Sequence, residues 1–252
     1  MKFATMTLSL LLAVAAVEAS SVEATYFGME NPGRRVVQLR SGNKNYSVWA
    51  GKSVFQIQNR NFGGSFDAEL DNLPPIFNAY CIDFNQSIYP NTNDTWTLAS
   101  LVDAPVPGAK MNSTQASMIA YLYGAYSASS YQVELQLAIW EILEETQNSY
   151  DIASGDFRAR NSSQYDGTVL SGWFSDMASM SFDPADYSGY FALTSETTQD
   201  FITEDTFVQP APDPDDPRQP GQGDVIPEPI TFIGGLLGFG AVGRYFRRRR
   251  AC

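Results

Sequence analysis

Residues 35–58 read RVVQLRSGNKNYSVWAGKSVFQIQ, and this stretch decides the class of fold. Three short runs in it mix β-branched and aromatic residues with polar ones, and Ser-Gly-Asn and Gly-Lys breaks separate the runs. Such a pattern is typical of β-strands joined by tight turns. We therefore expect strands at Val36–Leu39, Tyr46–Ala50 and Val54–Gln58.

Other segments extend this pattern along the chain. The sequence predicts three further strands, at Phe77–Phe84, Tyr190–Thr194 and Phe201–Val208. It also predicts a short helix at Thr114–Tyr123, which Asn112 or Ser113 caps and which Gly124 ends. Helices and strands therefore belong to the same part of the chain.

The segment Val133–Glu145 has the clearest helical periodicity. Its apolar residues recur three and four positions apart, at Leu135, Ala138, Ile139 and Ile142. The acidic residues between them are expected to face water, namely Glu134, Glu141, Glu144 and Glu145. We expect an α+β fold, in which residues 20–208 form one β-rich extracellular domain with one or two packed helices.

Composition excludes several classes of function. The chain has 252 residues, a net charge of −12, no histidine and two cysteines. Between Ser20 and Pro229, 10 Lys and Arg residues stand against 27 Asp and Glu, and such an acidic body repels nucleic acid. Without histidine, Ser-His-Asp and Cys-His catalysis and His-ligated zinc are excluded. We expect no metal and no cofactor.

The N-terminus resembles a secretory signal peptide over residues 1–19. Lys2 supplies a positive charge, Leu8–Val17 is an apolar run, and Val17-Glu18-Ala19 offers small residues at a cleavage site. The apolar run is short for a membrane span. We expect residues 1–19 to be removed on export, the alternative being a buried N-terminal helix.

The C-terminal part divides into a linker and a tail. Residues 209–224 alternate proline with Asp, Gln and Gly, which predicts an extended linker. In residues 225–252, Pro227-Glu228-Pro229 precedes the uncharged run Ile230–Gly243, and the chain then carries Arg247, Arg248, Arg249 and Arg250. This order predicts a C-terminal transmembrane helix with its arginines in the cytoplasm.

This tail resembles the PEP-CTERM sorting signal of Gram-negative surface proteins, a kind of tail also labelled an ice-binding protein C-terminal domain. The resemblance implies an exosortase-type protease as a partner and a membrane-anchored intermediate in the inner membrane. It also implies final placement at the cell surface or in the extracellular matrix. The alternative is a permanent single-span anchor.

A second resemblance concerns the body of the chain. Tyr80-Cys81-Ile82-Asp83 and Leu135-Gln136-Leu137-Ala138-Ile139-Trp140 are similar to the two motifs of the thioester domains of surface adhesins, except that Leu135 stands where those domains usually have Thr. The resemblance implies that Cys81 and Gln136 condense into an internal thioester, which an amine-bearing partner attacks. Trp140 is placed to shield Gln136, and Asp83 to hold a backbone group or manage a proton.

These observations leave three functions open. The first is a non-enzymatic surface or matrix protein that adheres covalently through Cys81 and Gln136. The second is an inert structural or carbohydrate-matrix protein, in which Gln136 is a helix-surface residue, Cys81 a small buried one and Trp140 part of the core. The third is an exported carboxylate-based hydrolase, but the spacing of Asp83, Glu141 and Glu144 does not mark an acid–base pair.

Overall fold

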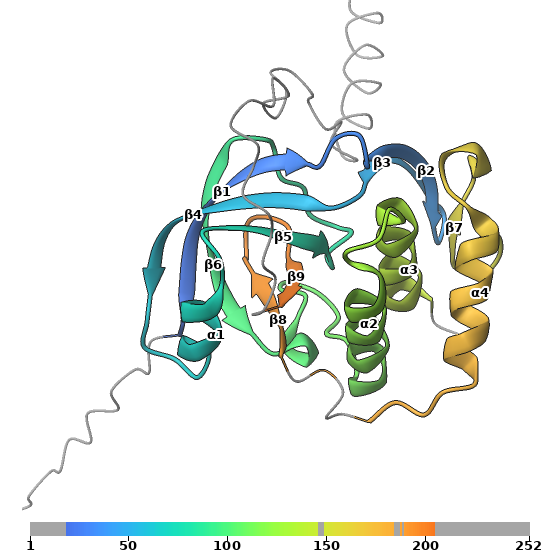
Figure 1. Ribbon diagram of the computed structural model, residues 1–252. Coiled ribbons are helices and arrows are strands. Elements are labelled where there is room, and N and C mark those ends of the chain that lie inside the picture. Colours follow the sequence, from blue (N-terminus) through green and yellow to red (C-terminus); the bar gives the residue numbers. More distant parts are fainter. Residues whose placement is uncertain (1–18, 146–148, 184–186, 188, 205–252) are drawn as a thin grey trace, which may run out of the picture.

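The computed structural model describes residues 19–145, 149–183, 187 and 189–204. The expected linker and sorting tail lie outside these residues, as does the expected signal peptide except for Ala19. Figure 1 shows a barrel of strands on one side and a group of helices on the other, which confirms the β-rich α+β class. Among the described residues no helix has the length and apolar character that a membrane span requires.

Six antiparallel strands form a closed barrel in the order β1-β4-β5-β9-β8-β6. Their bounds are β1 Ser21–Met29, β4 Ser53–Asn61, β5 Ile76–Cys81, β6 Thr92–Ala99, β8 Tyr190–Thr194 and β9 Phe201–Glu204. Burial alternates along β1, where Val22, Ala24 and Tyr26 point into the core, as expected for a strand with one face inward. Closure pairs every barrel strand on both sides.

Aromatic rings fill the inside of the barrel. The ring of Phe55 stacks on Phe77 with 5.2 Å between centroids, and it meets Trp96 and Phe201 edge-on at 5.3 and 4.8 Å. Each of these four side chains is fully buried. Offset and edge-on pairs of this kind add about 1 kcal/mol each to the burial of apolar area, so the barrel has a rigid core that fixes the ends of its strands.

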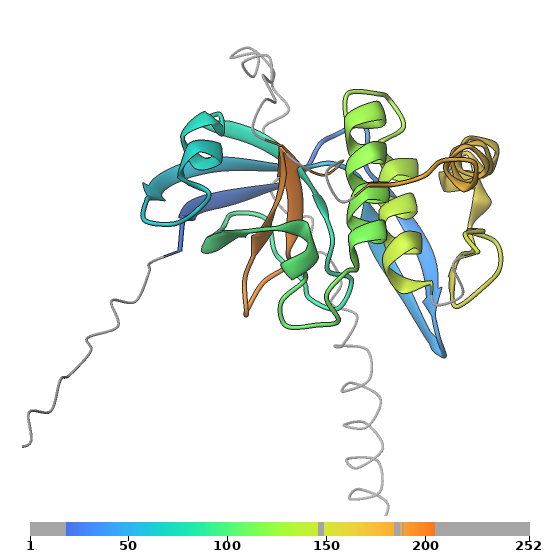
Figure 2. The same ribbon diagram turned by 90° about the horizontal axis from the view of Figure 1, so that it is seen from below.

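Helices and a small sheet form the other half of the molecule. The helices of this half are α2 Ser113–Tyr126, α3 Gln132–Glu144 and α4 Gly167–Ala178, with a single turn at Ser162–Gln164. Helix α1 Asp67–Asn72 lies beside the barrel instead (Figure 1), and the single turn at Leu101–Asp103 contacts β8 and α2. The sheet has the order β3-β2-β7, from β3 Lys44–Ala50, β2 Arg35–Ser41 and β7 Phe157–Ala159. Figure 2 shows α2 and α3 between the barrel and α4. Helix α3 packs against β5, β3, β7, α2 and α4.

The central position of α3 overturns the prediction that its glutamates face water. Glu141 is fully buried, and Glu134 and Glu145 are 8 % and 4 % exposed. Their carboxylates accept hydrogen bonds from the backbone N–H groups of Asp151, Asp166 and Asp156 respectively. Glu144, which is partly exposed, accepts from the hydroxyl of Ser41. Because other elements surround α3, its polar positions bind neighbouring backbone instead of water.

Two predicted boundaries were also wrong. Helix α2 does not end at Gly124 but continues to Tyr126, and a Cβ at position 124 would lie 2.3 Å from the hydroxyl oxygen of Tyr190, which would have to move. The strand expected to run to Phe84 ends at Cys81. The Asp83 carboxylate accepts the N–H of Asn85 in the turn that follows, so Asp83 lies beyond the strand.

Candidate functional site

Cys81 lies at the end of β5, where one side of its ladder is vacant. Strand β4 begins at Ser53, which lies opposite Ala79, so no residue of β4 faces Cys81. On the other side of β5, Cys81 lies opposite Phe201 of β9. A buried strand residue whose N–H and C=O face a vacant edge needs other partners for them.

The side chain of Gln136 supplies both partners. Its Oε1 accepts the N–H of Cys81 at 3.0 Å, and its Nε2 donates to the Cys81 carbonyl at 2.8 Å. Both residues have no exposed surface. The carboxamide therefore makes the hydrogen bonds that a residue of β4 would otherwise make. The structure brings Cys81 and Gln136 together as expected, and the interpretation of Gln136 as a helix-surface residue was wrong.

The thiol lies in a dry and acidic environment. Its Sγ donates to the backbone carbonyl of Asp83 at 3.0 Å. Burial raises the pKa of the Cys81 thiol strongly, and the nearby carboxyl groups of Asp83 and Asp200 raise it further. The indole of Trp140 lies close enough to lower this pKa, although its Nε1 makes no conventional hydrogen bond. The sulfur is thus held as a neutral thiol until a neighbour takes its proton.

Two buried carboxyl groups flank the thiol. Burial raises the pKa of Asp83, whose Oδ2 is buried without a hydrogen-bond partner. Burial also raises the pKa of Asp200 to about 7, and the charge of Asp83 adds to this rise. The carboxyl of Asp200 accepts the N–H groups of Val106 and Ser195, so it ties two loops to the barrel end. Sequence reasoning found Asp83 but missed Asp200, because no local pattern connects Asp200 with Cys81.

This arrangement can support condensation of the two side chains. Attack of sulfur on Cδ of Gln136 would place negative charge on Oε1, which already accepts the Cys81 N–H. A backbone donor at that distance stabilises such an oxyanion. The carboxyl of Asp83, whose charge acts on the thiol and whose Oδ2 has no hydrogen-bond partner, is a candidate acceptor for the thiol proton.

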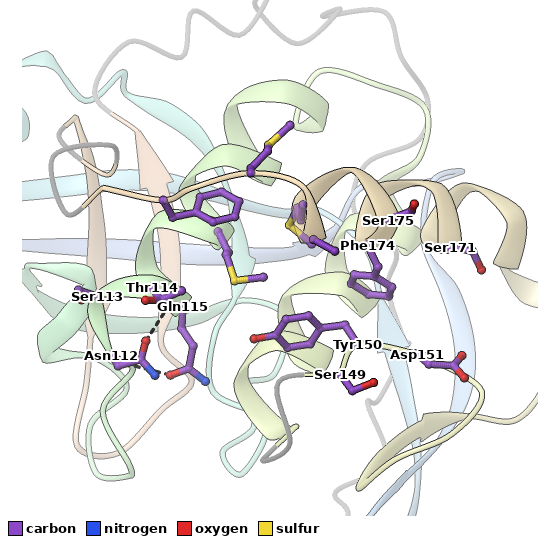
Figure 3. A pocket seen from close by; sticks show the side chains of 15 residues that line it. Asn112, Ser113, Thr114, Gln115, Ser149, Tyr150, Asp151, Ser171, Phe174 and Ser175 are labelled. Carbon is purple, nitrogen blue, oxygen red and sulfur yellow. Dashed lines mark hydrogen bonds between the residues drawn. The ribbon is translucent and has the colours of Figure 1, made fainter.

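A wide groove lies elsewhere. It has a volume of about 760 Å³ and opens between the start of α2 and α4 (Figure 3), with Met118, Phe174 and Met177 on its apolar side. Asn112 and Gln115 line it too, but they bond to each other and cap α2. No residue with a buried, unpartnered polar atom lines this groove in the described structure. We therefore place the candidate site at Cys81.

Comparisons of the chain with protein-family models, curated proteins and solved structures find no match. The function of the site is therefore inferred from its own contacts alone. Within the described residues, no group of three or more Cys, Asp or Glu side chains is arranged to hold a metal ion.

Proposed function

We propose that this chain is an exported surface or matrix protein whose body attaches covalently to amine-bearing partners through a thioester between Cys81 and Gln136. One observation carries the proposal. The carboxamide of Gln136 is fixed against the backbone of Cys81 by two hydrogen bonds in a site that excludes water. Holding the carboxamide beside the residue that carries the thiol lowers the entropic cost of bringing the two reacting groups together.

The reaction balances without a cofactor. Asp83 takes the thiol proton, Sγ bonds to Cδ of Gln136, and the bond from Cδ to Nε2 breaks. The proton returns to the leaving nitrogen, which departs as ammonia. A partner amine then attacks the thioester carbonyl, forms an amide and releases the thiol, because a thiolate leaves readily.

The proposal is tested by the mass of the body, residues 20–224, in which Cys81 is the only cysteine. We expect a fraction lighter by one ammonia, which methylamine converts to an adduct with one new thiol. Because Cys81 is buried, thiols are counted after unfolding in urea at about pH 6.5 with a maleimide, which still alkylates thiols at that pH. The Cys81→Ala variant should give neither signal. Full mass in the unchanged body, with one alkylated thiol and no methylamine adduct, contradicts the thioester.

A second candidate function is that of an inert structural protein. The two hydrogen bonds between Gln136 and Cys81 are consistent with it too. Gln136 completes the hydrogen bonding of β5, which is sufficient reason for a buried glutamine. In that case the two hydrogen bonds between Gln136 and Cys81 only stabilise the packing of α3 against the barrel. The mass measurement distinguishes the two functions, because only condensation expels ammonia.

Export and sorting are proposed from the two chain ends. A chain that stops at Asp224 is expected to appear in the culture medium, because it lacks the apolar run and the arginines that hold the complete chain in the membrane. Cell fractionation with an antibody against the body measures this.

The complete chain is expected to be cut near Pro227–Pro229 after export. Mature surface protein that still carries Arg247–Arg250, as seen in its C-terminal peptides, would instead establish a permanent anchor.

A further inference from the structure

A second carboxamide on α3 lies one turn before Gln136. It belongs to Gln132, the first residue of the helix, which is 9 % exposed. Its Nε2 donates to Oε2 of Glu30, which follows β1, at 2.5 Å. Its Oε1 is buried and has no hydrogen-bond partner. A glutamine that is buried for purely structural reasons is expected to have both ends of its amide bonded.

A lysine amine reaches the same carboxylate oxygen. The Nζ of Lys52, just before β4, lies 2.9 Å from Oε2 of Glu30. The side chain of Lys52 is only 10 % exposed, which is rare for lysine, and that of Glu30 is 36 % exposed. One carboxylate oxygen thus contacts both an amine and a carboxamide.

The backbone fixes the positions of these three residues. The N–H of Glu30 donates to the carbonyl of Lys52 at 2.8 Å, so their side chains start from adjoining points. The chain passes close to the carboxamide at Gly33, where a Cβ would lie 1.9 Å from Oε1 of Gln132. A residue larger than glycine would therefore displace Gln132 from Glu30.

We propose that Lys52 and Gln132 condense into an intramolecular amide, with Glu30 as the proton carrier. The Lys52 ammonium gives one proton to the Glu30 carboxylate, and the neutral amine attacks Cδ of Gln132. Glu30 then moves a proton from the attacking to the leaving nitrogen, and the bond from Cδ to Nε2 breaks. The leaving nitrogen departs as ammonium, which restores the Glu30 carboxylate and leaves one new amide bond.

This crosslink joins the start of β4 to the start of α3. It needs no cysteine, so it is independent of the thioester. The two bonds also differ in chemistry, because methylamine cleaves a thioester and leaves an amide intact. Both would anchor α3 to the barrel, one turn of the helix apart.

Trypsin distinguishes the two crosslinks in the complete chain. An unmodified Lys52 is cut, whereas an amide at its Nζ prevents the cut and leaves residues 45–60 joined to residues 111–158, which contain Gln132. A thioester would instead join residues 61–110 to residues 111–158. In the complete chain carrying Cys81→Ala, we expect the joined species that contains Lys52, lighter by one ammonia than its two parts.

Two variants serve as controls. Glu30→Gln keeps the shape of the side chain but cannot carry the proton, so at least a tenfold loss of the joined species is expected. Lys52→Arg keeps the positive charge, lacks the nucleophile, and should be cut at position 52. Full cutting at Lys52 in the Cys81→Ala chain, with no joined species, would show an ordinary ion pair and overturn the proposal. An undiminished joined species in Glu30→Gln would overturn the role of Glu30.

Discussion

Replacing Gln136 with alanine in the Cys81→Ala background is expected to lower the free energy of unfolding by about 3–5 kcal/mol. The substitution leaves a buried N–H and a buried C=O of residue 81 without partners, at about 1–3 kcal/mol each. It also leaves a cavity at a fully buried position, which adds to the cost. The Cys81→Ala background removes any thioester from the comparison.

Urea unfolding measures this difference. Gln38→Ala in the same background is the matched control, because the Gln38 side chain is exposed on β2 and only its backbone makes hydrogen bonds to Asn161 and Arg160. The control should change the free energy of unfolding by no more than about 0.5 kcal/mol. A similarly small loss for Gln136→Ala would mean that its carboxamide does not hold the end of β5.

The second large effect is a loss of stability as the pH rises. Burial raises the pKa of Glu141 to about 8, and the charges of Glu145 and Asp151 add to the rise. Asp200 has a pKa of about 7 for the same main reason. Because the folded state holds these protons more tightly than the unfolded chain, their stabilising contribution is complete below about pH 4. This stabilising contribution is lost as the pH rises through the folded-state pKa values of about 7 and 8. The loss of stability amounts to several kcal/mol in all.

The variant Glu141→Gln isolates one of these groups. Its Oε1 can still accept the N–H of Asp151, and the new amide stays neutral at every pH. The variant should match the unchanged protein near pH 5 and exceed it by about 2 kcal/mol or more near pH 9. Urea unfolding at both pH values measures this. An equal dependence on pH in the two proteins would show that Glu141 does not titrate as a buried acid.

The sequence predicted the positions of helices and strands better than it predicted which of their side chains are buried. The strand Tyr190–Thr194 was placed correctly, and the helix at 133–145 was one residue late at each end. Strands β1 and β6 and helix α4 were missed. In α4 the buried residues recur at helical spacing, at Leu170, Trp173, Phe174 and Met177, but Gly167 and Gly172 weaken the helical pattern.

The candidate site was predictable only where its residues lie in short local motifs. Cys81 and Gln136 were found from short motifs, and their contact follows from the packing of α3 on β5. The vacant ladder position beside Cys81 was not predictable, because it depends on where β4 begins. The Glu30–Lys52–Gln132 cluster was also missed, since its members come from three distant segments that the pairing of β1 with β4 and the packing of α3 bring together.

The position of β9 as the last described strand has a mechanical consequence. A partner joined to Gln136 and an anchor beyond Glu204 would pull on the chain at two points, and tension would run along the covalent path between them. That path contains the rest of α3, then β7, α4, β8 and β9. The first six strands, α1 and α2 lie outside it. They resist the pull only through the strand pairs β5–β9 and β6–β8, along which the loaded strands would shear.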